Sequence, residues 1–488
     1  MTLKKNIIWL YLISFLFIAV NAYFIIHEKY LFTLFPVILL FILIAFMALD
    51  KLILFIVFLT PLSIPLQELL PRLEFDMYLP TEPLLFGVLI LFFIKLAIEK
   101  KFDKRILTHP VSIALYINLA WILITCITST MPLVSAKFFA ARLWFLIAFY
   151  FIATQMFKDF KNIFRFYWLY ILAFLVVIGY TIYNQSKAGF FNQQMAHHVM
   201  QPFFNDHTSY GAILAMFFPF IVGITFAKIF PGRIKPVFIL LLLVFISAII
   251  LSYTRAAWVS IIFAVLVWGI IKLRIKFRSL AITLIITGAL FFTFYGDIIM
   301  YLERNRQDSS TNLTEHIQSI YNISSDASNL ERINRWSSAI RMFREKPLLG
   351  WGPGTYMFQY APFQFSYEKT IISTNAGDMG NAHSEYIGPL SESGILGMLT
   401  FLAIIVMVIY TGQRVYFRAT DRRIKFFSLT ALLGLMTYYL HGLMNNFLDT
   451  DKASVPFWGF TAILVALDVY HSQNQQAQDT DNIPQESS

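Results

Sequence analysis

The sequence is poor in charged residues and almost free of cysteine. Charged residues make up 14% of the 488 residues, whereas 58% are hydrophobic. The only cysteine is Cys126, so neither a disulfide framework nor a cysteine metal site can be built within the chain. A soluble core of this size could not enclose so much apolar surface. The composition therefore excludes an ordinary soluble protein and indicates a membrane protein.

Apolar runs long enough to cross a bilayer recur along the chain. A helix of about 20 residues spans the hydrocarbon core with all its backbone hydrogen bonds made internally. We therefore expect an all-α, polytopic membrane protein with about fourteen transmembrane helices. The expected spans are residues 6–26, 31–49, 52–67, 79–98, 110–129, 138–157, 163–183, 209–230, 236–253, 256–271, 279–300, 393–411, 427–448 and 454–470.

Lysine and arginine are distributed unevenly over the connections between these spans. With the N-terminus inside, the inner connections contain basic clusters at 95–105, 272–278 and 414–425, whereas the short outer connections contain isolated residues such as Lys29 and Arg255. This bias follows the positive-inside rule and predicts that both termini are cytoplasmic. It also accounts for the net charge of +10, and nothing further in the sequence favours binding to nucleic acid.

This topology predicts four regions. Residues 1–300 form an N-terminal bundle of about eleven spans, and residues 301–385 form one long extracytoplasmic loop. Residues 386–470 form the C-terminal transmembrane helices, and residues 471–488 form a disordered cytoplasmic tail. The first apolar run has no clear small-residue cleavage pattern, so we expect it to be retained as a span. Because long loops in compact proteins usually carry function, we expect the site in the outer loop.

The long outer loop contains one amphipathic helix. Ile333, Trp336, Ile340 and Phe343 recur at spacings of three and four within residues 329–344, which predicts a helix with one apolar face. Such a helix can lie on the outer leaflet with its arginines at the level of the lipid headgroups.

A glycine-rich turn follows this helix. Pro347 is expected to end the helix, and Gly350, Gly352 and Gly354 permit sharp turns and close backbone approaches. The turn does not match a P-loop or a dinucleotide fingerprint, because those motifs follow a strand.

Three residues with charge or proton-transfer chemistry lie at the expected outer boundary of the membrane. Arg255 joins two spans through almost no loop, and Arg142 lies inside the start of another span. Charged side chains in a membrane tend to face a polar cavity, although an arginine at the interface can also reach water. His383 precedes an apolar span, where it could act chemically, cap the helix or make a core hydrogen bond.

Other polar residues near this boundary have structural interpretations. Asp206 and His207 precede a span as part of an N-cap cluster. Glu392, Gly394 and Gly397 are typical of close helix packing with one hydrogen-bonded carboxyl group.

Two pairs of acidic residues could be interpreted as metal ligands. They are Glu74 with Asp76 and Asp449 with Asp451. The same spacing recurs in the expected disordered tail, so the pattern arises easily. We predict no metal site.

Taken together, these elements resemble the O-antigen ligase and O-antigen polymerase superfamily, which includes proteins with a Wzy_C-type domain. Its motifs match in order and rough spacing, and the best-matched region is residues 205–400. Ser384 stands where asparagine is common, which weakens any role for that side chain. The matching motifs are Thr254-Arg255-Ala256, Glu331-Arg332 to Trp336, Pro347 to Gly354, His383-Ser384-Glu385-Tyr386 and Glu392 to Gly397.

The resemblance implies a fold similar to that of GT-C glycosyltransferases and a specific reaction. An inverting enzyme of this kind passes a glycan from undecaprenyl pyrophosphate to an acceptor sugar or hydroxyl, such as lipid A core, without metal or other cofactor. It does so on the outer face of the bacterial inner membrane. By resemblance Arg255 and Arg332 bind the pyrophosphate, with Arg335 as the alternative to Arg332, and His383 is the catalytic base. The resemblance leaves supporting or packing roles for Tyr386, Glu392, Gly394, Gly397, Asp206 and His207.

Two alternatives stay open. A Wzy-type polymerase needs the same pyrophosphate-binding residues and base, but it extends the growing glycan on its lipid carrier. A transporter of lipid-linked substrate would instead place charged or broken helices near the middle of the membrane and often shows internal repeats. The distinctive charges of this sequence gather at the outer boundary, which favours an enzyme.

Overall fold

The structure is a computed structural model with side chains, and it is mostly helical, as expected. It describes residues 2–28, 32–33, 35–36, 48–69, 77–99, 102–190, 192–227, 229–274, 282, 293, 327–369, 373 and 380–472. The expected spans at 31–49 and 279–300 and the expected tail at 471–488 lie almost wholly outside these residues. Because residues 301–326 lie outside as well, the division into four regions stays a prediction.

Nine helices of the described residues are long and apolar enough to cross a membrane. Each coincides with one of the expected spans, which confirms a multi-pass membrane protein. Two of them, at 132–156 and 451–471, contain short π-helical segments. The nine are α5 (Thr81–Glu99), α7 (Pro110–Ile127), α8 to α9 (Pro132–Met156), α10 (Phe160–Ala188), α12 (His207–Phe226), η4 with α13 (Gly232–Leu251), α14 (Arg255–Lys272), α19 (Ile387–Arg418) and α21 with η8 (Asp451–His471).

One of the remaining described spans differs from the expectation, so the total of fourteen stays a prediction. Helices α1 (Thr2–Ile26) and α20 (Arg422–His441) are present. The span expected at 52–67 is an 11-residue helix, α3 (Leu49–Leu59), followed by a 3-10 turn and a strand. Proline cannot donate the backbone hydrogen bond that continues an α-helix, and two prolines follow Thr60, at 61 and 65.

Strands are almost absent from the described residues. The two short strands β1 (Ile64–Pro65) and β2 (Tyr78–Leu79) pair antiparallel, with Ile64 opposite Leu79 and Pro65 opposite Tyr78. The pair folds the segment between α3 and α5 back on itself.

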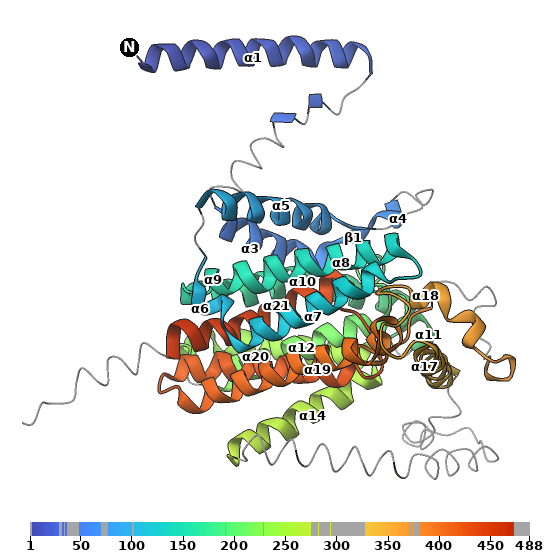
Figure 1. The fold of residues 1–488 in the computed structure, drawn as a ribbon. Helices are drawn as coiled ribbons and strands as arrows, with labels where there is room; N and C mark the ends of the chain where they lie inside the picture. The colour runs from blue at the N-terminus through green and yellow to red at the C-terminus, as the bar shows by residue number, and fades with distance from the viewer. Residues whose placement is uncertain are drawn as a thin grey trace, which may run out of the picture.

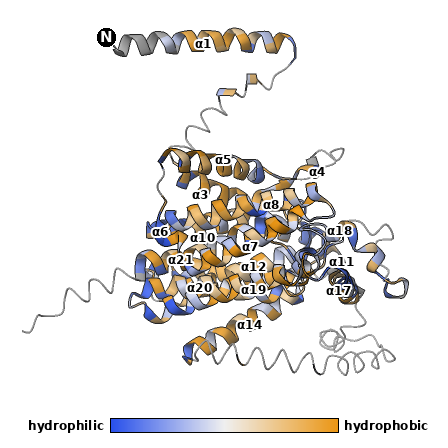
Figure 2. Cartoon of the chain, viewed as in Figure 1, coloured by the Kyte–Doolittle hydropathy of each residue, from blue (hydrophilic) through white to orange (hydrophobic). Residues whose placement is uncertain are grey.

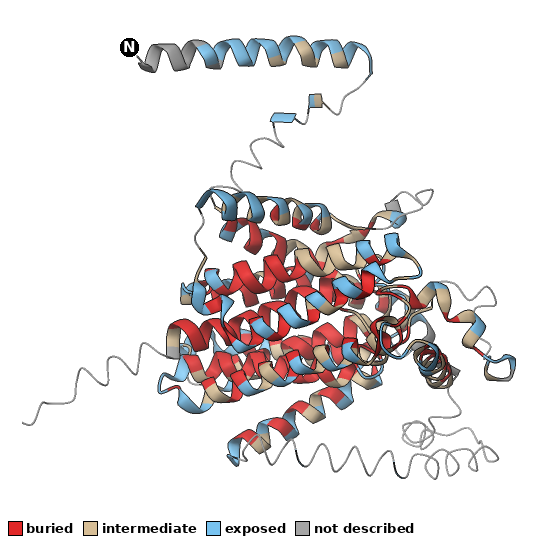
Figure 3. Cartoon of the chain, in the orientation of Figure 1, coloured by how far each residue is buried: buried red, intermediate tan, exposed pale blue. Residues whose placement is uncertain are grey.

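Helix α21 lies in the middle of the bundle. All of its residues are buried, and it packs against α8, α9, α12, α19 and α20. Figure 3 shows this buried centre, and Figure 2 shows that hydrophobic residues predominate along the bundle helices. Stacked rings fill the centre, where Tyr167 lies 4.0 Å from Phe220 and 4.9 Å from Phe460 between ring centroids. By contrast, α5, α13 and α14 expose large apolar side chains, as expected of helices that face lipid.

The two ends of the bundle have different structures. At one end lie α11 (Gln193–Ala196), α17 (Ala327–Glu345) and α18 (Tyr356–Gln359), together with the N-terminal ends of α12, α14 and α19; we call it the loop end (Figure 1). The opposite end contains basic and acidic side chains in ion pairs. Arg105 pairs with Asp103 at 2.8 Å, and Arg414 pairs with Asp468.

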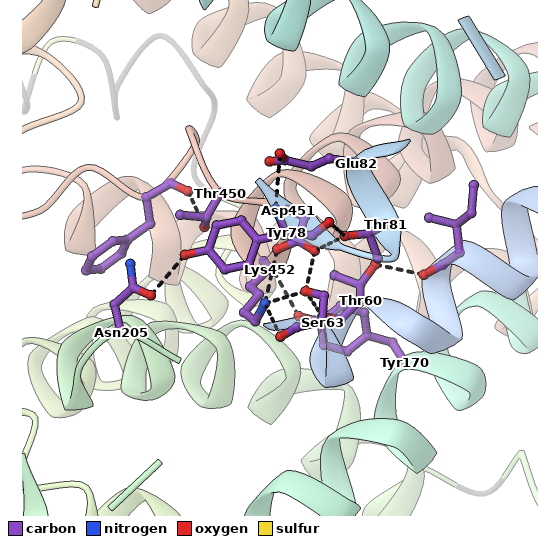
Figure 4. Close-up of polar contacts among 12 residues, drawn as sticks. Thr60, Ser63, Tyr78, Thr81, Glu82, Tyr170, Asn205, Thr450, Asp451 and Lys452 are labelled. Carbon is purple, nitrogen blue, oxygen red and sulfur yellow. Dashed lines mark hydrogen bonds and ion pairs between the residues drawn. The ribbon is translucent and has the colours of Figure 1, made fainter. Parts of the chain in front are cut away.

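A buried polar cluster attaches the β1–β2 segment to the start of α21 (Figure 4). The Asp451 carboxylate accepts hydrogen bonds from Ser63 Oγ at 2.6 Å and Thr81 Oγ1 at 2.5 Å, and it lies 3.2 Å from Lys452 Nζ. The Lys452 ammonium also lies 4.2 Å from the ring centroid of Tyr78. Protein donors therefore occupy Asp451, and no cluster of possible metal ligands occurs among the described residues.

Candidate active site

Helix α17 turns a polar face toward the protein. Glu331, Asn334, Arg335 and Ser338 recur at helical spacing and are all buried. The predicted apolar face is the more exposed one, since Ile340 is 38% exposed. The predicted helix is thus confirmed, while its contact with lipid stays a prediction. Sequence periodicity did not reveal the buried polar face, because its partners come from distant loops.

Arg335 is held by contacts within the loop end. Its Nε lies 2.7 Å from Glu331 Oε1, and both side chains are almost fully buried. Its guanidinium lies 3.9 Å from the ring centroid of Tyr360, and the Tyr356 hydroxyl donates to its backbone carbonyl at 2.8 Å. The backbone of Gly380 lies so close to the guanidinium that a Cβ at this position would overlap it. Arg335 therefore ties α17 to two later segments of the loop, one at Tyr356 and Tyr360 and the other at Gly380.

The glycine-rich turn packs backbone against backbone with α19. Gly350 and Gly394 both have positive φ, of 66° and 69°. A Cβ on Gly394 would lie 2.0 Å from the carbonyl oxygen of Leu348, so only glycine permits this crossing. The Glu392 carboxylate accepts a hydrogen bond from the backbone N–H of Tyr356 at 3.0 Å. The predicted close approach of this turn to another group is thus confirmed.

His383 lies where the loop turns into α19. Its φ of 47° is unusual for a residue other than glycine. Its backbone N–H donates to Asn381 Oδ1 at 3.1 Å, and Trp336 Nε1 donates to its carbonyl oxygen at 3.4 Å. These contacts fix the backbone of His383, whose side chain is half-buried, beside the middle of α17.

The surroundings keep the His383 imidazole neutral. Burial lowers the pKa of His383 to about 4, and the positive charges of Arg332 and Arg335 lower it further, while Asp206 and Glu331 oppose them. Above this pH the ring can accept a proton, as a general base must.

The start of α12 lies next to the same group. Asp206 caps this helix, as predicted, by accepting the N–H of Ser209 at 2.7 Å. The His207 ring stacks on His197 with 4.0 Å between centroids, and Arg332 acts electrostatically on His207. Arg332, from α17, therefore faces residues from both α12 and the loop.

Arg255 joins the group through its neighbour. Thr254 Oγ1 donates to the carbonyl of His207 at 2.7 Å, and a Cβ on Gly211 would lie 2.6 Å from that hydroxyl oxygen. The turn before α14 is therefore pressed against the first turns of α12. Arg255 is the first residue of α14 and is exposed.

Glu385 links α19 to the connection between α20 and α21. Its carboxylate accepts hydrogen bonds from the Tyr438 hydroxyl at 2.6 Å and from the N–H groups of Phe447 at 2.8 Å and Leu448 at 2.9 Å. Burial raises its pKa to about 7, and the Asp449 carboxyl adds to that shift. The prediction assigned Glu385 no role of its own, although it lies within the matched motif.

The supporting residues predicted around His383 make packing contacts. The Tyr386 hydroxyl donates to the carbonyl of Tyr439 at 2.7 Å. A Cβ on Gly397 would lie 2.4 Å from that of Ser393, so Gly397 packs closely within α19. The chemical roles predicted for the site residues themselves stay predictions.

Residues 238–402 match the family model described as O-antigen ligase. This part of the chain is similar to the O-antigen ligase family. The expected resemblance is thereby confirmed, and the matched region contains Arg255, Arg332, Arg335 and His383. No curated protein matches the chain in sequence. The match and the apolar helices together make this a membrane protein of the O-antigen ligase and polymerase type.

Proposed function

We propose that the protein transfers a glycan from undecaprenyl pyrophosphate to the hydroxyl of an acceptor saccharide, at the outer face of the inner membrane. The observation that carries the proposal is the approach of α17 to His383: Trp336 donates a hydrogen bond to the His383 carbonyl, and Arg332, one helical turn earlier, acts electrostatically on the imidazole. A base that can take a proton and a cation that can bind a phosphate are the two groups that this reaction needs.

In the proposed mechanism, His383 takes the proton from the acceptor hydroxyl. The acceptor oxygen attacks the anomeric carbon from the face opposite the leaving group, and the bond from that carbon to the pyrophosphate oxygen breaks. Attack from the opposite face inverts the anomeric configuration. General base catalysis of this kind contributes roughly 10²–10⁴-fold to a rate.

Arginines stabilise the charge that grows on the leaving pyrophosphate. Guanidinium groups bind phosphates through two parallel charge-assisted hydrogen bonds. We assign this role to Arg332 and Arg255, which are both accessible. Arg335 is engaged by Glu331 and Tyr360, so we assign it the task of holding α17 and the loop in place.

The proposal is tested with purified protein in lipid nanodiscs, supplied with lipid-linked glycan and acceptor. His383→Ala should lower the transfer rate by at least about 100-fold without changing the unfolding temperature, because it removes the base. His27→Ala, at the end of α1, is the matched control and should transfer normally. Equal rates in the two variants would contradict the proposal.

A polymerase would use the same residues, so the acceptor has to be identified separately. In a deletion strain, a ligase leaves full-length glycan on its lipid carrier, whereas a polymerase leaves single repeat units. Loss of surface glycan in that strain, together with lipid-linked glycan retained on the inner leaflet, would favour the transporter.

A further inference from the structure

A fourth arginine, Arg142, lies inside the bundle near the proposed site. It belongs to α8, about 15 Å along the helix from Pro132, at a rise of about 1.5 Å per residue. Its guanidinium lies 5.3 Å from the ring centroid of Phe138 and 5.9 Å from that of Trp458. It makes no hydrogen bond or ion pair with any residue that the structure describes. A half-buried charge in a membrane-spanning helix normally faces polar surroundings.

Three carboxyl groups lie within electrostatic range of this guanidinium. Arg142 acts electrostatically on Glu385, Glu392 and Asp449. Glu385 and Glu392 are each committed to backbone N–H groups, as described above. Their main task is therefore to hold the connection 442–450 and the glycine-rich turn.

Asp449 differs from the other two carboxyl groups. Its side chain is exposed and, among the described residues, makes neither a hydrogen bond nor an ion pair. Its position is nevertheless fixed, because the N–H of the preceding residue, Leu448, donates to Glu385 at 2.9 Å. Asp449 thus offers two acceptor oxygens at a defined place close to Arg142.

Trp458 adds a donor to this group. The residue is 1% exposed, and its Nε1 has no hydrogen-bond partner in the described part of the chain. A buried N–H without a partner is costly, and such groups often mark the place of a ligand or an ordered water. Arg142, Asp449 and Trp458 thus supply a cation, an acceptor and a donor that make no hydrogen bond through their side chains within the described part of the chain.

The local charge indicates what kind of ligand fits. Three carboxyl groups face one guanidinium here, so this region disfavours a pyrophosphate or any other anion. A saccharide hydroxyl can donate to a carboxylate and accept from a guanidinium at the same time. An uncharged sugar with neighbouring hydroxyls therefore matches both groups.

We propose that Arg142 and Asp449 bind the acceptor saccharide of the proposed transfer, and that its reactive sugar is uncharged. The inference rests on the proposed function. His383 precedes Glu385 by two residues, and Glu385 accepts the N–H of Leu448, the residue before Asp449. The base and this acceptor group are therefore connected through one short stretch of chain and one hydrogen bond.

The test measures initial transfer rates while acceptor and donor are varied separately. Asp449→Asn and Arg142→Gln should each raise the KM for an uncharged acceptor by about 10- to 100-fold, as expected for the loss of a charged hydrogen bond. The KM for the lipid-linked donor should change less than about twofold. Asp50→Asn and Arg418→Gln, two exposed positions outside both groups, are the matched controls. Unfolding temperatures identify variants that fail to fold, and Asp449→Glu and Arg142→Lys serve in their place.

The outcomes separate this inference from the proposed function. A rise in donor KM, or a fall in kcat with acceptor KM unchanged, would overturn the acceptor assignment. An acceptor with a carboxylate on its reactive sugar should be a poorer substrate than an uncharged one, and Asp449→Asn should reduce the difference in rate between the two acceptors. If the acidic acceptor is as good as the uncharged one or better, the inference that the reactive sugar is uncharged is wrong. If His383→Ala and Arg332→Ala also transfer normally, the proposed function itself is wrong.

Discussion

The charged groups on the two sides of His383 differ. On one side α17 supplies Arg332 and Arg335, opposed by Asp206 and Glu331. On the other side a single guanidinium, Arg142, faces three carboxyl groups. We call these the basic side and the acidic side. One turn of chain, from residue 383 to residue 385, separates them.

The difference between the sides suggests how one site can sort two substrates. A glycosyl donor that leaves as pyrophosphate needs cations, and it would be repelled by clustered carboxylates. An uncharged acceptor needs hydrogen-bonding groups but little net charge. The different charged groups on the two sides of the base would therefore direct the donor to the basic side and the acceptor to the acidic side. They would also keep the donor from binding on both sides.

The largest expected effect is a difference in stability between two variants of the basic side, Arg335→Ala and Arg332→Ala. Arg335→Ala leaves Glu331 buried without its partner, so it should lower the free energy of unfolding by about 3–5 kcal/mol. Arg332→Ala should leave stability nearly unchanged but weaken donor binding. Denaturant unfolding followed by tryptophan fluorescence, combined with donor KM, measures both. If both variants have the same free energy of unfolding, the assignment of Arg335 to holding the loop and of Arg332 to binding the donor is wrong.

On the acidic side, Glu385 tests whether the carboxyl groups there are structural or ligand-binding. Glu385→Ala leaves a hydroxyl and two backbone N–H groups without an acceptor, so we expect a loss of about 2–3 kcal/mol of stability. Glu385→Gln keeps one acceptor oxygen and should lose less. Asp449→Asn, which breaks no described contact, should not change the free energy of unfolding. If Asp449→Asn loses as much stability as Glu385→Ala, the distinction between a structural Glu385 and a ligand-binding Asp449 is wrong.

The smallest effect concerns pH. Because the pKa of His383 is lowered to about 4, the base stays neutral from neutral pH down to about pH 4, and transfer should fall only below that value. Arg332→Gln removes a positive charge that disfavours imidazolium, so the acidic limb should move to higher pH. Burial is the larger cause of the shift, so the limb should stay below the ordinary value of 6.5. The residual transfer activity of this variant, profiled against pH, measures the shift, and an unmoved limb would place Arg332 outside the range of His383.

Much of the fold was predictable because the signals for it are local. Apolar runs gave nine spans that coincide with helices, and the spacing at 329–344 gave α17. Gly350 and Gly394 were predicted to permit close approach, and each proved to occupy a crossing that no side chain could enter. In these cases one stretch of sequence contains the whole physical reason.

The acidic side was not predictable, because its parts share no periodicity. Arg142, Glu392 and Asp449 belong to three separate segments, and no spacing connects them. The same holds for Arg335: its partner Glu331 is one helical turn away, but Tyr360 and Gly380 come from later parts of the loop. Sequence alone therefore left Arg332 and Arg335 as alternatives for the same role, whereas the structure shows that Arg335 pairs with Glu331 within α17.

The enclosed position of α21 has a consequence for how the protein is made. This helix is the last of the described ones to leave the ribosome, yet the others surround it. The helices inserted earlier must therefore remain in the bilayer without α21 between them. The connection 442–450, which contains Asp449, reaches its place only when α21 has inserted. Activity should consequently appear late in biogenesis, in a single step, after most of the chain has already been inserted.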